Sequence, residues 1–166
     1  EVTVSDFPSV VERGLVEGYY GNPYSEADRM SLFKMFGRMK MNVYIYGPKD
    51  DVYHKNRWRE NYPEELGNKI KEYVKAAKAN KVDFVWAIHP GNDIQWNKTD
   101  SINIVNKLKA MYNLGVRTFA VFFDAASTFF RSLCSFDISA LNSIVMPLVS
   151  AIYNYPPRNA SKSLCV

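Results

Sequence analysis

The sequence predicts an α/β fold built on a parallel β-sheet, and three observations support this. Four short apolar segments alternate with three segments of helical periodicity between residues 14 and 123. The apolar segments lack polar alternation, which is typical of strands covered on both faces. Polar and glycine residues follow each of them. Repeated βα units of this kind form either a doubly wound sheet or a closed barrel.

The first βα unit is predicted from a strand and a strong helix start. Residues 14–20 form the strand, and Ser25 is a favourable N-cap with Glu26 and Asp28 in the first helical turn. Residues 42–46, rich in β-formers, are the second strand. The apolar face of the helix comprises Met30, Phe33, Met35 and Phe36.

The second and third units follow the same logic. Pro63 is a good first-turn residue and begins a helix that runs to about residue 80. Residues 82–88 are a third strand, and Thr99 or Asp100 caps a third helix that Gly115 ends. The apolar faces of these helices comprise Leu66, Ile70, Tyr73, Val74 and Ala77 in the first, and Ile104, Leu108 and Met111 in the second.

The C-terminal part of the chain is less regular. Residues 118–123 are a fourth strand without polar alternation. Residues 137–154 could form a helix, residues 143–149 a strand interrupted by Pro147, or both in distorted form. The whole chain, 1–166, is therefore expected to be a single domain, with 128–166 left without a firm assignment.

Composition and charge exclude several classes of function. Hydrophobic residues make up 47% of the chain, enough for a packed globular domain. The net charge is +4, but the basic run between Lys69 and Lys81 is interspersed with acidic residues and is typical of a solvated helix face. Nucleic-acid binding would need a segregated basic stripe, and we expect none. We also expect no membrane span, because no apolar run approaches about 20 residues.

The cysteines and histidines do not suggest a metal centre. Cys134 and Cys165 are far apart, and neither they nor His54 and His89 have the spacing of zinc ligands. Whether the cysteines pair is open. The chain begins at Glu1 without an initiator methionine or a signal peptide, as an excised part of a longer protein would.

The polar residues that follow the strands indicate the kind of chemistry. Parallel α/β folds place their sites at the carboxyl ends of the strands. The glycines form neither phosphate-binding pattern, and no nucleophile elbow occurs. Carboxylates, a lysine and aromatic rings remain, and these side chains suit sugar recognition and glycosidic cleavage.

Four segments around the predicted strands form recognisable motifs. They are 13–23 (RGLVEGYYGNP), 40–51 (KMNVYIYGPKDD), 83–91 (DFVWAIHPG) and 114–124 (LGVRTFAVFFD). These segments resemble glycoside hydrolase family 84, which includes the O-GlcNAcases and bacterial β-N-acetylglucosaminidases, and the likeness extends over about residues 6–127.

The resemblance implies a (β/α)8 (TIM) barrel, of which this chain holds about the first four βα units, a half barrel. It also implies removal of terminal β-linked N-acetylglucosamine with retention, in which the substrate's acetamido oxygen forms an oxazoline, without metal or cofactor. Carried over by position, Asp124 orients the acetamido group, the Gly18 carbonyl and Lys49 bind the sugar, and His89 is a structural residue behind the site.

One position departs from the family pattern. Where the family has a second Asp, the general acid, this chain has Ala125, which cannot donate a proton. An engineered replacement, an inactive natural relative and a divergent sequence from this point onward all remain open. The enzyme is therefore expected to be impaired, and the alternative is a non-catalytic protein that binds N-acetylglucosamine or glycoproteins. An unrelated α/β binding module is a third reading.

The length of the chain also departs from the family. A (β/α)8 barrel usually takes about 250 residues, so we expect this segment to pair with a missing second half or to form a homo-oligomer. The expected partner otherwise is a glycan or glycoprotein that carries N-acetylglucosamine. The motifs look closer to bacterial secreted or periplasmic members than to nucleocytoplasmic ones.

Overall fold

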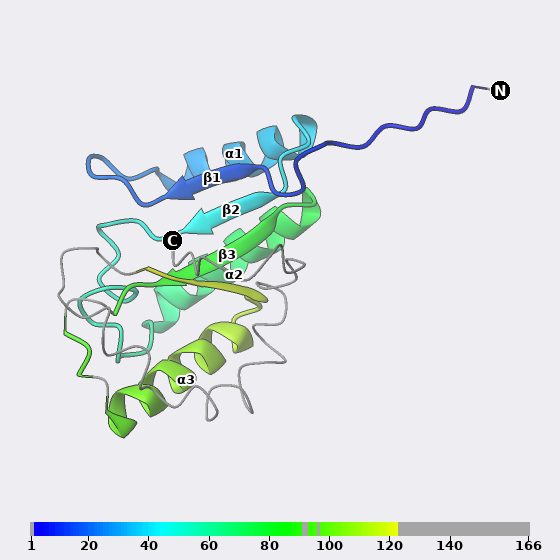
Figure 1. Ribbon diagram of the computed structural model, residues 1–166. Coiled ribbons are helices and arrows are strands. Elements are labelled where there is room, and N and C mark those ends of the chain that lie inside the picture. Colours follow the sequence, from blue (N-terminus) through cyan, green and yellow to red (C-terminus); the bar gives the residue numbers. More distant parts are fainter. Residues whose placement is uncertain (1, 91–92, 96, 123–166) are drawn as a thin grey trace, which may run out of the picture.

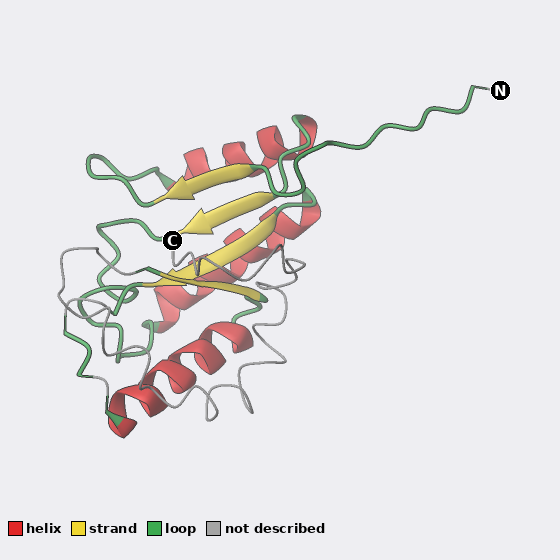
Figure 2. Ribbon diagram, viewed as in Figure 1, coloured by secondary structure: helices red, strands yellow, loops and turns green. Residues whose placement is uncertain are grey.

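Four parallel strands with helices on one side form the described part of the computed structural model, which covers residues 2–90, 93–95 and 97–122 (Figures 1 and 2). The strands pair in the order β1-β2-β3-β4. This confirms the predicted fold class, a partial α/β fold consistent with half of a TIM barrel. The elements are β1 (Gly14–Glu17), α1 (Glu26–Arg38), β2 (Val43–Tyr46), α2 (Glu64–Ala79), β3 (Asp83–Ile88), α3 (Lys98–Asn113) and β4 (Thr118–Val121).

The first two helices begin where the sequence predicts. The Ser25 hydroxyl accepts a hydrogen bond from the backbone N–H of Asp28, and the Asp28 carboxylate accepts one from the backbone N–H of Ser25, a complete capping box. Pro63 directly precedes α2, where its lack of a backbone N–H costs nothing.

The expected start of α3 was wrong. Asn97, not Thr99 or Asp100, is the N-cap, and its side-chain oxygen accepts the backbone N–H of Asp100 at 2.8 Å. The Asp100 carboxylate instead accepts two bonds of 2.7 Å from the guanidinium of Arg59. A long-range partner thus draws the Asp100 side chain away from a capping role.

Strands are shorter than the sequence predicts, most clearly β1, which was expected over residues 14–20. Its pairing with β2 ends at Glu17, beyond which only the backbone N–H of Gly47 bonds to the Glu17 carbonyl. In β4 the expected burial on both faces does not extend to Val121, which is 47% exposed. The domain assignment of 1–166, including the segment 128–166, lies mostly outside the described residues and stays a prediction.

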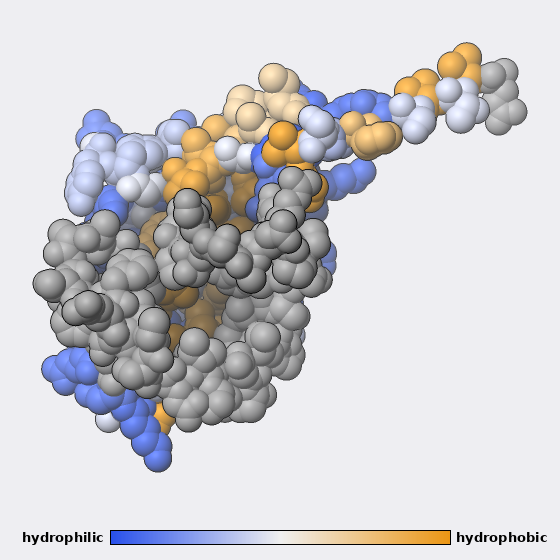
Figure 3. Space-filling view, viewed as in Figure 1, coloured by the Kyte–Doolittle hydropathy of each residue, from blue (hydrophilic) through white to orange (hydrophobic). Residues whose placement is uncertain are grey.

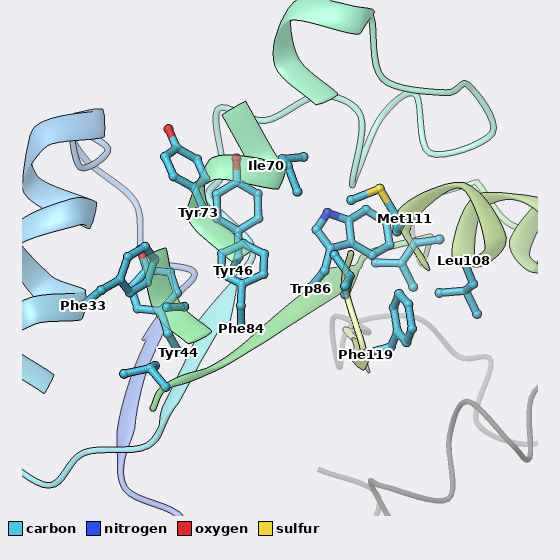
Figure 4. Packing of buried hydrophobic residues seen from close by; sticks show 14 of the residues in the cluster. Phe33, Tyr44, Tyr46, Ile70, Tyr73, Phe84, Trp86, Leu108, Met111 and Phe119 are labelled. Carbon is cyan, nitrogen blue, oxygen red and sulfur yellow. The ribbon is translucent and has the colours of Figure 1, made fainter. Parts of the chain in front are cut away.

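The core lies between the sheet and the helices and is dominated by aromatic rings (Figure 4). Along this face Tyr44 of β2 stacks on its register partner Phe84 of β3, and Trp86 is fully buried. Met35 and Leu66, expected to be buried, are 44% and 38% exposed. At about 100° per residue, Met35 points away from the buried Phe33 and Phe36, whereas Leu66 lies in the first turn of α2. The remaining members of the packed cluster include Phe33, Phe36, Ile70, Tyr73, Leu108, Met111 and Phe119.

The N-terminal residues 2–12 extend away from this body (Figure 1). They carry exposed apolar side chains, among them Val2, Val4 and Phe7 (Figure 3). No helix among the described residues is both long enough and apolar enough to cross a membrane.

Candidate active site

Three strand ends converge at the carboxyl edge of the sheet. The ring of Phe122, which directly follows β4, lies against Gly47 so closely that a Cβ on Gly47 would be 2.7 Å from it. A Cβ on Gly18 would lie 3.9 Å from the same ring and 3.9 Å from the Gly47 carbonyl oxygen. The residues that follow β1, β2 and β4 therefore share one small region.

The two glycines of this region are under different constraints. Gly47 cannot accept a side chain without displacing the Phe122 ring. At Gly18 the nearest atom to an added Cβ would be a methyl carbon of Val16 at 3.6 Å, an ordinary contact distance. Packing within the described residues therefore requires glycine at position 47 but not at position 18.

Lys49 is presented by a tight β-turn. The backbone N–H of Asp51 donates to the carbonyl of Pro48 at 3.1 Å, so Lys49 and Asp50 occupy the two central positions. The Lys49 ammonium lies 5.2 Å from the centre of the Tyr20 ring, and within the described part of the chain it forms no ion pair. A shallow depression beside it is lined by Glu17, Tyr19, Gly21, Pro23, Pro48, Lys49 and Asp50.

The Asp51 carboxylate anchors the far corner of this turn. It accepts hydrogen bonds from the hydroxyls of Tyr46 at 3.1 Å and Tyr62 at 2.7 Å, and from the backbone N–H of Tyr53 at 2.8 Å. Burial, and next the nearby Asp51 carboxylate, raise the pKa of Tyr62 well above its ordinary value. Tyr62 therefore remains protonated and continues to donate to Asp51.

The imidazole of His54 anchors the near corner. His54 is fully buried, and its Nε2 lies 2.8 Å from the Pro48 carbonyl oxygen. Because a carbonyl only accepts, Nε2 must carry the proton. Burial lowers the pKa of His54, which favours the neutral ring.

His54 also connects β2 to β3. Its carbonyl accepts the backbone N–H of His89 at 2.7 Å, and the two rings meet edge-on at 6.5 Å. His89 is 1% exposed, which agrees with its expected location behind the site, while its structural role stays a prediction.

The carboxylate of Glu17 is bound within the scaffold. It forms a two-point ion pair with Arg29 of α1, with distances of 3.0 Å to Nε and 2.7 Å to a terminal nitrogen, and accepts a further bond from the Tyr44 hydroxyl. Glu17 is 1% exposed. Although this residue ends β1, its side chain is directed to the helices and is not available to a ligand.

The carboxylate that follows β3 is similarly occupied. Asp93 accepts the indole N–H of Trp58 at 2.8 Å and forms an ion pair with Arg59. Since Arg59 also bonds Asp100, one guanidinium ties the loop after β2 to the loop after β3. Polar residues thus follow β1, β2 and β3, but the Glu17 carboxylate ties β1 to α1 and β2, and the carboxylates of Asp51 and Asp93 tie loop segments together.

The sequence analysis identified some residues of the candidate site and did not identify others. Gly18 and Lys49 lie on the two neighbouring loops after β1 and β2, as predicted. Asp124 and Ala125 lie outside the described residues, as do Cys134 and Cys165. Among the described residues no group of three or more His, Cys, Asp or Glu side chains could hold a metal ion.

Comparisons with known proteins agree on one family. The β-N-acetylglucosaminidase family model matches residues 13–141. Protein O-GlcNAcase of Rattus norvegicus and that of Mus musculus are each 33% identical over 146 residues, which is 86% of this chain and 16% of either relative. The solved structure of CpGH84B is 39% identical, with a TM-score of 0.77 over 89% of this chain and 26% of that chain. This chain therefore spans only a small part of the length of the relatives it matches.

Proposed function

The chain belongs to the β-N-acetylglucosaminidase family, glycoside hydrolase family 84, and from this premise we propose that it supplies the first half of a barrel that acts on terminal β-linked N-acetylglucosamine. The cleavage proceeds with retention through an oxazoline that the substrate's own acetamido group forms. The observation that carries the proposal is the convergence of Gly18, Lys49 and Phe122 at one edge of the sheet.

Gly18 and Lys49 are proposed to bind the sugar hydroxyls. The Gly18 carbonyl accepts a hydroxyl, and the absence of a side chain lets the ring approach the backbone. Since no packing contact within the described residues demands glycine at 18, ligand approach is a sufficient reason for it. The Lys49 ammonium forms no ion pair within the described residues, so its donors stay available to the sugar.

Asp124 is proposed to orient and polarise the acetamido N–H, so that the acetamido oxygen attacks the anomeric carbon. It follows β4 by three residues, and Phe122, two residues before it, packs beside Gly18 and Gly47. This neighbourhood supports its placement in the same cleft. Neither a metal nor an organic cofactor is part of the proposed mechanism.

Ala125 occupies the position of the general acid in this alignment. The leaving oxygen therefore departs without a positioned proton donor, a contribution typically of about 10²- to 10⁴-fold in rate. For the same reason a non-catalytic protein that binds N-acetylglucosamine is the second candidate, and the replacement at 125 is the observation that favours it.

Restoring the carboxylate tests the proposal. In a full barrel that carries this segment, Ala125→Asp should accelerate hydrolysis of an alkyl or serine-linked N-acetylglucosaminide by about 10²-fold or more. A nitrophenyl glycoside should gain much less, because nitrophenolate leaves without protonation. Asp124→Asn serves as the control and should slow both substrates. Equal gains on the two substrates, or none, would show that residue 125 is not the general-acid position.

A further inference from the structure

Lys49 lies in a turn whose first and last residues, Pro48 and Asp51, are hydrogen-bonded to side chains of the protein interior. The Pro48 carbonyl is the acceptor that closes the turn, and it receives two donors, the backbone N–H of Asp51 and Nε2–H of His54. Both lone pairs of this oxygen are thus occupied. Any rotation of the Pro48 peptide would break both bonds and would displace Lys49, the next residue.

We propose that His54 is a positioning residue for Lys49: its imidazole donates to the Pro48 carbonyl and thereby fixes the turn from which the Lys49 ammonium reaches the sugar. Only the last step, contact between Lys49 and the sugar, rests on the proposed function. The fixing of the turn itself does not depend on what the site binds.

The geometry around His54 supports a positioning role over a catalytic one. The ring is fully buried, so it does not contact a ligand, and its own backbone is tied to β3 through His89. His54 therefore transfers the rigidity of the sheet to the loop. Three charged or titratable groups face the ring: Asp51, His89 and Lys49. Within the described residues Nδ1 has no hydrogen-bond partner, so a second proton on this ring would be buried without an acceptor.

Two substitutions separate the hydrogen bond from the volume of the ring. His54→Gln retains an N–H donor near the position of Nε2, whereas His54→Leu fills the space without a donor. In the whole chain, amide hydrogen exchange at Asp51 reports whether the turn is closed. We expect exchange at Asp51 to rise about three- to tenfold in His54→Leu, the loss of one hydrogen bond, and to stay near the original rate in His54→Gln.

The pH dependence gives a second readout that a merely space-filling residue would not produce. Asp51 exchange, corrected for its intrinsic pH dependence, should accelerate as His54 becomes protonated in acid, and His54→Gln should abolish that step. If His54→Leu does not fold, this comparison between the original chain and His54→Gln decides alone. Unchanged Asp51 exchange in a folded His54→Leu chain, or the same acid step in His54→Gln, would overturn the inference.

Binding of N-acetylglucosamine separates this inference from the proposed function. His54→Leu should weaken binding about three- to tenfold, and it should add little once Lys49→Met has removed the ammonium. If the original chain, joined to its full barrel, does not bind the sugar, the proposed function fails. The exchange data then still test whether His54 fixes the turn. If Lys49→Met weakens binding and His54→Leu does not, the positioning role fails and the proposed function stands.

Discussion

The two ends of the sheet differ in the length and in the chemistry of their connections. At the amino ends of the strands, residues 39–42, 80–82 and 114–117 join each helix to the next strand by short turns. At the carboxyl ends the connections are longer in sequence, comprising residues 18–25, 47–63 and 89–97. The short connections each contain one residue with left-handed backbone, namely Lys40, Lys81 or Gly115.

The comparison shows where carboxylates serve stability and where a site can form. The long loops contain nearly all the polar networks described above, yet most of these networks are internal. Glu17 faces Arg29, Asp51 faces two tyrosines, and Asp93 faces Trp58 and Arg59. A polar residue after a strand is thus not by itself a sign of catalysis. In the described residues the Lys49 ammonium forms no ion pair and lies over the Tyr20 ring.

The largest expected effect comes from the ion pair at the boundary between scaffold and site. Arg29→Met should lower the free energy of unfolding by about 3–5 kcal/mol, because it leaves the Glu17 carboxylate buried without its cation. Urea unfolding of the two chains measures the difference. If Glu17 belonged to an open cleft, solvent would replace Arg29 and the loss would be small.

A matched control for this prediction is an exposed ion pair. Lys69 and Glu65 lie one helical turn apart on α2, with side-chain exposures of 41% and 82%. Lys69→Met should change the free energy of unfolding by less than about 0.5 kcal/mol. Similar losses in both variants would remove the distinction between scaffold and surface charge.

The sequence predicted the elements well because each has a local cause. Ser25 with Asp28, Pro63, and Gly115 are short-range signals, and they mark helix ends correctly. The cap of α3 was missed because Arg59, distant in sequence, binds the Asp100 carboxylate. The lengths of the strands were overestimated because the pairing between neighbouring strands stops where their backbones diverge. Amino-acid composition does not encode that point.

The site was predictable only in part, for the same reason. Gly18 and Lys49 were predicted from family-like motifs; they lie on neighbouring loops, and their contact with a sugar stays a prediction. Asp51, His54 and Tyr62 were not singled out, although they shape the Lys49 turn. Their partners are a backbone carbonyl and hydroxyls from other segments, so only the folded chain shows what these side chains do. The available signal in the sequence was that a lysine, two acidic residues and a histidine follow β2 within a few positions of one another.

A smaller effect is expected from Lys107, a cation buried beneath the long loop after β2. Its side chain is 1% exposed, donates to the Glu60 carbonyl, and lies 4.4 Å from the Tyr62 ring centre. Burial lowers the pKa of Lys107 from 10.5 to about 8. Between these values the unfolded chain keeps a proton that the folded chain has released, so stability should rise with pH.

The expected gain between pH 8 and pH 10 is at most about 3 kcal/mol, measured by urea unfolding across that range. Well below pH 8 both states are protonated and Lys107 contributes no slope. Above pH 10 the tyrosines act in the opposite direction, since burial raises the pKa of Tyr62 in the folded state. Lys107→Met should flatten the rise. An equal slope in that variant would place its origin elsewhere.

The smallest expected effect lies at the opposite end of the sheet, in the turn between α2 and β3. Lys81 has a backbone φ of 59°, a left-handed conformation that costs a residue with a Cβ about 1–2 kcal/mol. Lys81→Gly removes this cost, but the added freedom of the unfolded chain offsets about 0.5–1 kcal/mol. The net result should be a gain of about 0.5–1 kcal/mol in the free energy of unfolding. Lys81→Ala, which loses the same charge but retains Cβ, should show no such gain.

Sugar affinity should be unchanged in both variants, because this turn lies at the end of the sheet remote from Lys49. A change in affinity would contradict the separation between the two ends, and equal stability of the Gly and Ala variants would contradict the left-handed backbone as its cause.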